Sequence, residues 1–296
     1  MSLQRMCQLG QVSRAGWYRQ GVPSQPPLDL PEDQGADPQA DRDLKLRDEI
    51  QKIALEWPAY GSRRITAELR RRKWTVNRKR VQRLMREDNL LCLRKRKFVV
   101  TTDSDHGLRV YPNLARQMTL TGIDQLWRAD ITYVRLAVEF VYLAVILDAY
   151  SRRVIGWELD ATLEDSLTLA ALRMALSRRT VTPELVHHSD RGVQYASGDY
   201  TQLLKDHHIQ ISMSRKANPW DNAACESFMK TLKCEEVYRT EYRDQAQARV
   251  RIGEFLEGVY NETRLHSALD YRPPAEFERD LRAAQKKEAA PRRLIA

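Results

Sequence analysis

The sequence predicts an α/β protein, in which a mixed five-stranded sheet flanked by helices follows a small all-α region. Two observations support this fold class. Apolar residues recur at helical spacing between residues 42 and 97, and in the pattern of strands after about residue 122. Extended and helical segments then alternate in the order βββαβαβα, which a mixed sheet with helices on its faces accommodates. With 296 residues, the chain is long enough for one large domain and a smaller one.

The first 97 residues are predicted to form three segments. Residues 1–20 are predicted as a short helix, and residues 21–41 carry five prolines with little apolar content, which is typical of a linker. Residues 42–97 are predicted to hold a helix that ends at Pro58, a second helix over residues 62–72, and a third helix for which Asn77 is the N-cap. This succession is typical of a helix-turn-helix DNA-binding region.

Positive charge is concentrated in this helical region. The whole chain has a formal net charge of +9, and residues 60–100 alone hold 15 Lys and Arg against three acidic residues. Such a local field favours phosphate backbones, so nucleic acid is the expected partner. Arg78, Lys79 and Arg80 open the third helix, and we predict that they bind DNA, because the first turn of a recognition helix meets the groove. A basic helical hairpin that docks on the next domain is the alternative.

The composition argues against a membrane-spanning or secreted protein. The longest apolar run, residues 140–147, has eight residues, far fewer than the roughly 18 that span a bilayer. The first 20 residues lack the apolar region of a secretory signal. The four cysteines form no C-x-x-C pair, which fits a reducing compartment and argues against structural zinc. We therefore expect a cytoplasmic protein without membrane contact, associated with the nucleoid when it is bound to DNA.

Residues 98–122 are predicted as a connector, and the segments that build the sheet follow it. Strands are expected over residues 126–135, 140–148, 154–159, 185–188 and 209–213. Helices are expected over residues 163–179, 197–207 and 221–236, the first of them opened by a capping box of Thr162 and Asp165. This order over residues 123–240 is the layout of a ribonuclease-H-like core. Residues 241–296 are predicted as a helical extension with a basic tail.

Three acidic residues are predicted to meet at one end of this sheet. Asp130 lies inside the first strand, Asp190 directly follows the fourth strand, and Glu226 lies one turn into the helix over residues 221–236. Three carboxylates gathered in this way form an oxygen-only site for hard divalent cations. Two such ions can activate a nucleophile and stabilise the leaving oxygen of a phosphodiester, which is phosphoryl-transfer chemistry. By periodicity alone, Asp148 in the second strand is an alternative to Asp130.

The helix that carries Glu226 has a polar face beside that glutamate. At 100° per residue, Asn222, Lys230 and Lys233 fall within about 40° of Glu226, whereas Phe228 and Leu232 lie opposite. We expect the two lysines to hold DNA phosphates beside the metal site, and Asn222 to contact DNA as well. The alternative is that these polar residues only solvate the helix surface.

These residues together carry a family resemblance. The chain resembles the OrfB protein of the third insertion-sequence family, bacterial transposases whose catalytic domain is similar to retroviral integrase. In that family 35 residues separate the second aspartate from the glutamate, and a basic residue stands seven positions after the glutamate. Asp190 and Glu226 enclose 35 residues here, and Lys233 is the seventh residue after Glu226. The segments that match are WRADITYV, HSDRGVQYAS, NPWDNAACESFMKTLKCE, VSRAGWYR, YGSRRI and YNETRLHSALDYRPP.

The resemblance favours Asp130 over Asp148 as the first acid of the triad. The sequence departs from the family pattern at two positions of the C-terminal turn. Leu265 stands where the family commonly has proline, and Asp270 stands where it commonly has glycine. These departures concern the shape of the turn and not the chemistry. The resemblance implies a transposase that binds two Mg²⁺ ions, for which Mn²⁺ substitutes, at Asp130, Asp190 and Glu226. The substrates implied are the terminal inverted repeats of an insertion sequence and a target DNA.

The family also bears on partners and on rival functions. It implies a homo-oligomer on DNA and an upstream OrfA frame, supplied by fusion or as a partner protein. A non-catalytic DNA-binding regulator is an alternative from another class. A hydrolytic nuclease of the ribonuclease H type is a second alternative, since it shares the metal chemistry.

We predict that removing the charges of Arg78, Lys79 and Arg80 weakens the dependence of DNA binding on salt. Each lost phosphate contact is expected to flatten the plot of log affinity against log salt concentration by about 0.9, because fewer counterions are released. Titration of a labelled terminal-repeat duplex at several salt concentrations measures this slope. An unchanged slope would contradict the assignment of these residues to DNA.

Overall fold

The computed structural model describes residues 38–90, 108–215 and 219–289. The predicted helix over residues 1–20, the linker up to residue 37 and the basic residues 94–97 lie outside these ranges. The predicted connector and the predicted basic tail are described only in part, since residues 91–107 and 290–296 are not included.

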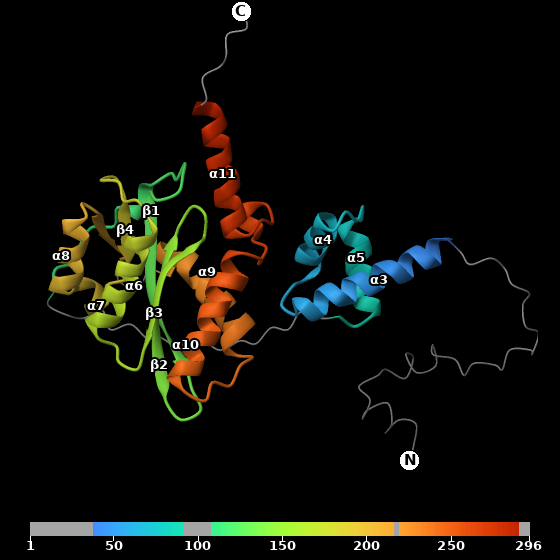
Figure 1. Cartoon of the computed structure of the whole chain (residues 1–296), viewed down its shortest axis with the longest axis horizontal. Coiled ribbons are helices and arrows are strands. Elements are labelled where there is room, and N and C mark those ends of the chain that lie inside the picture. Colours follow the sequence, from blue (N-terminus) through green and yellow to red (C-terminus); the bar gives the residue numbers. More distant parts are fainter. Residues whose placement is uncertain (1–37, 91–107, 216–218, 290–296) are drawn as a thin grey trace, which may run out of the picture. The chain divides into compact units, whose positions relative to one another are not determined.

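Three helices form the N-terminal region in the order that the sequence predicts (Figure 1). They are α3 (Pro38–Glu56), α4 (Ser62–Arg71) and α5 (Arg78–Glu87). The predicted N-cap of α5 is confirmed, because the side chain of Asn77 accepts a hydrogen bond of 2.8 Å from the backbone N–H of Lys79. The first helix begins earlier than predicted, at Pro38, and proline suits the first turn because a backbone N–H is not needed there.

The sheet has five strands, which confirms the predicted fold class. They are β1 (Leu126–Arg135), β2 (Phe140–Asp148), β3 (Val154–Asp160), β4 (Val186–Ser189) and β5 (Gln210–Met213), in the spatial order β3-β2-β1-β4-β5. The first three strands are antiparallel, while β4 pairs parallel with β1 and β5 parallel with β4. The switch from antiparallel to parallel pairing places the carboxyl end of β4 beside β1.

Helices cover both faces of the sheet, as Figure 1 shows. One face packs against α6 (Asp165–Arg178), α7 (Val193–Ala196) and α8 (Gly198–Asp206). The other face packs against α9 (Ala223–Leu232), the π-helical turn η3 (Lys233–Val237), α10 (Gln245–Glu254) and the π-helical segment η4 (Phe255–Asn261). The remaining elements are η1 (Ala115–Gln117), η2 (Pro219–Asn222), η5 (Ser267–Leu269) and α11 (Pro274–Ala289).

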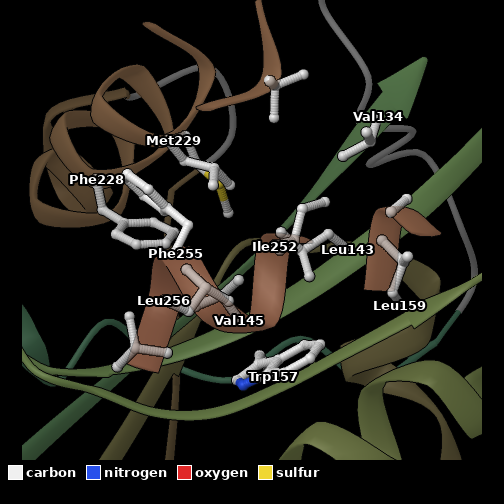
Figure 2. Packing of buried hydrophobic residues seen from close by; sticks show 14 of the residues in the cluster. Val134, Leu143, Val145, Trp157, Leu159, Phe228, Met229, Ile252, Phe255 and Leu256 are labelled. Carbon is white, nitrogen blue, oxygen red and sulfur yellow. The ribbon is translucent and has the colours of Figure 1, made fainter. Parts of the chain in front are cut away.

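A cluster of buried apolar side chains joins the sheet to α9 and α10. In Figure 2, Leu143, Val145 and Trp157 from the strands lie opposite side chains of α9, α10 and η4. Phe255 and Leu256, which follow residue 240, are buried in this cluster. The segment predicted as a C-terminal extension therefore contributes directly to the packing of the sheet.

Two more predicted helix starts are wrong. The helix predicted from residue 221 begins as α9 at Ala223, because residues 219–222 form the 3₁₀ turn η2. The helix α6 begins at Asp165 rather than at residue 163, and its N-cap is Glu164, without a side-chain capping hydrogen bond. The capping box of Thr162 and Asp165 does not form. Tertiary contacts explain the difference, because Leu163 packs partly buried against the cluster under α6, and its carbonyl oxygen accepts a hydrogen bond of 3.1 Å from Gln194.

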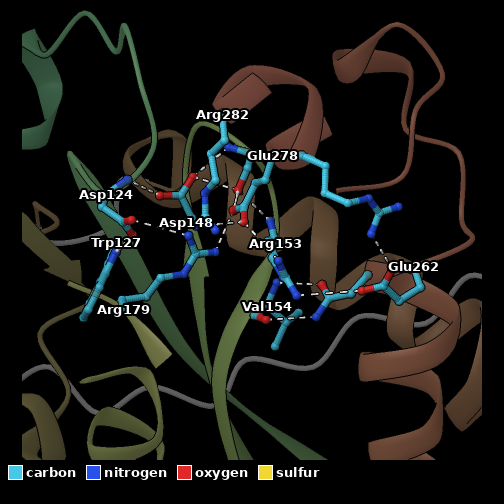
Figure 3. A network of polar contacts seen from close by, with 12 residues as sticks. Asp124, Trp127, Asp148, Arg153, Val154, Arg179, Glu262, Glu278 and Arg282 are labelled. Atoms are coloured by element: carbon cyan, nitrogen blue, oxygen red, sulfur yellow. Dashed lines mark hydrogen bonds and ion pairs between the residues drawn. The ribbon is translucent and has the colours of Figure 1, made fainter. Parts of the chain in front are cut away.

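The last helix, α11, is attached to the core by a buried ionic network (Figure 3). The carboxylate of Glu278 is only 2% exposed and accepts hydrogen bonds from Arg179 at 2.6 Å and from Arg153 at 3.0 Å. The guanidinium of Arg179 is itself 4% exposed. Burial tends to raise the pKa of Glu278, but the hydrogen bond and charge of Arg179 hold this pKa below its usual value.

Asp148 belongs to the same network and has a structural role. Its Oδ2 accepts a hydrogen bond of 2.7 Å from the backbone N–H of Asp124, and its Oδ1 accepts from the backbone N–H groups of Tyr150 and Ser151. The Ser151 hydroxyl lies between this carboxylate and that of Glu278. Because both oxygens of Asp148 are occupied by donors of the chain itself, this residue organises the turn between β2 and β3.

We predict that Glu278→Gln destabilises the fold by about 3–5 kcal/mol, because it removes the nearer of the two carboxylates paired with the buried Arg179, at 2.6 Å against 3.4 Å for Asp124. Asp280→Asn is the matched control on the same helix: its ion pair with Arg272 is more than half exposed on the aspartate side, and its loss is expected to cost less than about 1 kcal/mol. The free energy of unfolding, measured by urea denaturation, distinguishes the two. Equal losses of unfolding free energy in the two variants would show that burial does not make the Glu278 pair more stabilising than the exposed pair.

Candidate active site

The three predicted acids come from three elements that meet around β1. Asp130 lies within β1, Asp190 follows β4 directly, and Glu226 lies in the first turn of α9. The pKa of Asp130 is raised to about 7, first by burial and then by the negative charges of Asp190 and Glu226. The fold thus brings the three carboxylates into one electrostatic field.

Local hydrogen bonds orient the two aspartates. Oδ1 of Asp130 accepts a hydrogen bond of 2.9 Å from the backbone N–H of Ile131, and Oδ1 of Asp190 accepts one of 2.9 Å from the backbone N–H of Gly192. A Cβ atom at position 192 would lie 3.0 Å from that Asp190 oxygen. Glycine at this position therefore lets the turn after β4 close around the carboxylate. In contrast to the partly buried aspartates, Glu226 is exposed.

Two hydrogen bonds between β1 and the turn η2 hold the start of α9 next to the aspartates. The guanidinium of Arg128 donates to the backbone carbonyl of Asp221, and the side-chain amide of Asn222 donates to the carbonyl of Ala129 at 3.2 Å. Arg128 and Ala129 immediately precede Asp130. Since Glu226 lies one helical turn after Asn222, these bonds set the distance between the glutamate and β1.

The carboxylate of Asp221 is held in turn by Arg215, which follows β5. The guanidinium of Arg215 donates two hydrogen bonds of 3.0 Å to this carboxylate, and its backbone N–H donates a third. The hydrogen bond of Arg215 lowers the pKa of Asp221 well below its usual value. Arg215, after β5, and Asp221, before α9, are therefore held to each other, and Asp221 is also held to β1 by Arg128.

The polar residues predicted on α9 occupy three different environments. Lys230 is exposed, while Asn222 is only 8% exposed and its amide nitrogen is used within the fold. Lys233 opens η3, and its ammonium lies 4.6 Å from the centroid of the Tyr133 ring. Burial lowers the pKa of Lys233, and the charge of Asp130 opposes that shift. Arg78 and Lys79 are exposed at the start of α5, and Arg80 is partly exposed.

His188, the residue two positions before Asp190, has a structural role. Ser212 Oγ accepts hydrogen bonds from the backbone N–H groups of Leu114 and Ala115, so its own proton points to Nδ1 of His188, 2.8 Å away. Nε2 of His188 then carries the proton and donates to Ser214 at 3.0 Å. Burial lowers the pKa of His188 to about 4, so the ring is neutral near pH 7.

Sequence reasoning missed Arg128 and Arg215 as residues that hold the site. The spacing of Arg128, two residues before Asp130 in an alternating strand, puts both side chains on one face and was the available signal. Arg215 offered no comparable signal, because its partner Asp221 is identified only by the folded turn.

The chemistry of these residues fits divalent cations. All three side chains offer carboxylate oxygens, the ligands that hard cations prefer, and the repulsion that raises the pKa of Asp130 is relieved when a cation binds. Within the described ranges, no three acidic, histidine or cysteine side chains already converge as a complete metal site. The carboxylates therefore fit the ions by the chemistry of their oxygens, and Glu226 is the most exposed of the three.

Comparison with protein families defines the class. Residues 121–219 and 207–274 match the integrase core domain, and residues 41–98 match an HTH-like domain. The catalytic core domain of bovine immunodeficiency virus (BIV) integrase, a solved structure, is 17% identical with a TM-score of 0.41, over 55% of this chain and 99% of that one. The chain thus combines an integrase-type core with an HTH-like domain.

Two relatives identify the family. A 31 kDa protein of insertion element IS600 from Shigella sonnei, described as uncharacterized, is 40% identical and aligns with 92% of this chain and 97% of its own length. The transposase InsF of insertion sequence IS3A from Escherichia coli is 34% identical over 94% of both chains. The chain belongs to the IS3 family of insertion-sequence transposases.

No helix in the described ranges is long and apolar enough to cross a membrane.

We predict that Asp130→Asn stabilises the metal-free protein at pH 8.5 but not at pH 3.5, below the unfolded pKa of the aspartate. The raised pKa of about 7 means that protonated Asp130 favours the fold, a contribution that is complete below the unfolded pKa and is lost as the pH rises through 7. The asparagine variant cannot acquire the buried charge. Thermal unfolding in EDTA at both pH values measures the difference. A variant less stable than wild type at pH 8.5 would contradict the raised pKa.

Proposed function

We propose that this transposase is a metal-dependent polynucleotidyl transferase whose catalytic and metal-binding residues are Asp130, Asp190 and Glu226. The observation that carries the proposal is the shared field of the three carboxylates, which come from a strand, a turn and a helix. The 35 residues between Asp190 and Glu226, and the position of Lys233 seven residues after Glu226, agree with this proposal. Two Mg²⁺ ions are the proposed cofactors, and Mn²⁺ is expected to substitute because it accepts the same oxygen ligands.

The proposed reaction exchanges one phosphodiester bond for another. When bound, the ions activate the attacking oxygen and stabilise the leaving oxygen. In the first step a water oxygen attacks the phosphorus at the end of the element, and the bond to the 3′ oxygen breaks, which releases a 3′-hydroxyl. In the second step this hydroxyl attacks a phosphodiester of the target DNA. One P–O bond forms and one breaks in each step, so no nucleotide energy source is required.

The protein groups around the carboxylates have separate tasks in this proposal. The backbone N–H of Ile131 orients the carboxylate of Asp130, and the backbone N–H of Gly192 orients that of Asp190. Arg128 and Asn222 keep α9 against β1, so that Glu226 stays within reach. Lys230 and Lys233 are proposed to bind phosphates of the DNA strand that enters the site.

The helical region over residues 42–97 is proposed to bind the terminal inverted repeats, with Arg78, Lys79 and Arg80 on the phosphates. Two DNA ends must be joined to one target, so a homo-oligomer on DNA is proposed as the active assembly. An OrfA product, fused or separate, is proposed as a further partner. The protein would then work where its DNA is, on the nucleoid in the cytoplasm.

We predict that Glu226→Gln lowers strand cleavage and joining by about three orders of magnitude or more, because it removes one carboxylate of the triad. The assay uses labelled oligonucleotides with the ends that flank this gene, in Mg²⁺, Mn²⁺ or EDTA. Glu241→Gln is the matched control, since this glutamate is exposed beyond the site. The control variant is expected to join DNA at the wild-type rate.

The other outcomes identify the rival functions. Metal-dependent cleavage that never yields joined strands would point to a nuclease. DNA binding without cleavage, repeated with an OrfA fusion, would point to a regulator. Joining that survives Glu226→Gln would overturn the assignment of the triad.

A further inference from the structure

The contact between Lys233 and Tyr133 has no place in the chemistry described so far. The ammonium of Lys233 lies 4.6 Å from the ring centroid, within the range of a cation–π interaction. The other cation–aromatic pairs among the described residues use arginine. Lysine has a flexible stem and a compact charge, so its position depends more strongly on whatever the ammonium contacts.

The two residues lie on the two elements that carry the acids. Tyr133 lies three residues after Asp130 on β1, and because strand side chains alternate between faces, this odd spacing starts the two side chains on opposite faces of the strand. Lys233 lies seven residues after Glu226, along α9 and into η3, and seven residues return to nearly the same helix face. The contact at 4.6 Å therefore joins the tyrosine ring to the helix that carries Glu226, rather than to Asp130 directly.

The tyrosine ring is fixed by its surroundings. The ring of Phe140 packs against it edge-on, with centroids 5.7 Å apart and planes 74° apart. In the sheet, β4 pairs with β1 only at Leu126–Arg128, so β4 does not cover the edge of β1 at Tyr133. The ring is therefore held by packing on one side and available to a side chain from another element.

Lys233 depends on this ring because carboxylates do not anchor it directly. Among the described residues, the structure shows no salt bridge for Lys233 within 4.0 Å, although the charge of Asp130 acts on it from a greater distance. The aromatic ring and the negative charge of Asp130 thus both act on the ammonium of Lys233 before DNA arrives.

We propose that Tyr133 is a positioning residue, whose ring holds the ammonium of Lys233 beside Asp130, where it meets a phosphate of the DNA strand in the site. This inference rests on the proposed function, because it assumes that DNA enters between β1 and α9. The ring lowers the cost of ordering a long side chain on binding, so its loss weakens the phosphate contact without removing the charge.

The test is a double-mutant cycle on DNA affinity. The variants are Tyr133→Leu, Tyr133→Phe, Lys233→Met and the double variant Tyr133→Leu/Lys233→Met. Affinity for a duplex with the ends that flank this gene is measured in EDTA at several salt concentrations. Tyr142→Leu is the matched control, because Tyr142 is the cross-strand neighbour of Tyr133 on β2. Thermal unfolding of each variant reports whether the fold is retained.

Tyr133→Leu is expected to weaken binding about threefold to tenfold and to flatten the salt slope, as Lys233→Met does. Tyr133→Phe is expected to restore binding, because phenylalanine keeps the ring. In the Lys233→Met background, Tyr133→Leu is expected to change nothing further, whereas a purely structural role would weaken binding in both backgrounds. The proposal is overturned if Tyr133→Leu binds like wild type, or if the two losses add.

The assay separates this proposal from the proposed function. Binding in EDTA involves no strand cleavage, so the cycle is informative whether or not the protein joins DNA. If Glu226→Gln leaves joining intact, the catalytic assignment fails while the cycle still decides the role of Tyr133. If Lys233→Met binds DNA as tightly as wild type, Lys233 makes no phosphate contact, and the positioning role of Tyr133 is overturned with it.

Discussion

The structure depends on keeping three like charges together against their repulsion. Burial and, after it, the charges of Asp190 and Glu226 raise the pKa of Asp130 to about 7, which reflects the cost of an ionised carboxylate there when no cation is present. The force that opposes the repulsion is the burial of apolar side chains on the inner face of α9, among them Phe228 and Leu232, in the cluster that the sheet shares with α10. Hydrogen bonds from Arg128 and to Ala129 then decide where along β1 the helix begins.

Two aspartates on neighbouring strands show how surroundings divide similar residues between tasks. Asp130 has acids for neighbours and a single backbone donor, so its charge is uncompensated and available to a cation. Asp148 is fully buried but receives backbone N–H groups on both oxygens and sits in a network with Arg179 and Glu278. A carboxylate that the fold already satisfies is unsuited to bind metal, which is why periodicity alone could not separate the two.

Local patterns predicted the elements well, and long-range contacts set the details. Alternation predicted β1 to within its exact bounds, and helical spacing predicted that Glu226 and Lys233 share a face. The start of α6 was missed because Leu163 packs into the core, where Gln194, 31 residues later, donates a hydrogen bond to its carbonyl oxygen. The burial of Asn222 and the ring under Lys233 were missed for the same reason: each partner lies on β1, about a hundred residues earlier, and only the folded sheet brings them together.

The position of Glu278 near the end of the chain has a consequence for incomplete molecules. Asp130, Asp190 and Glu226 are all synthesised before α11, so a chain cut short after residue 270 contains every acid of the proposed triad. It lacks, however, Glu278, the nearer of the two carboxylates that pair with Arg179 inside the core. Such a product is exposed to cellular proteases through its unfolded state. The last helix thus makes the stability of the whole fold depend on synthesis that reaches the end of the chain.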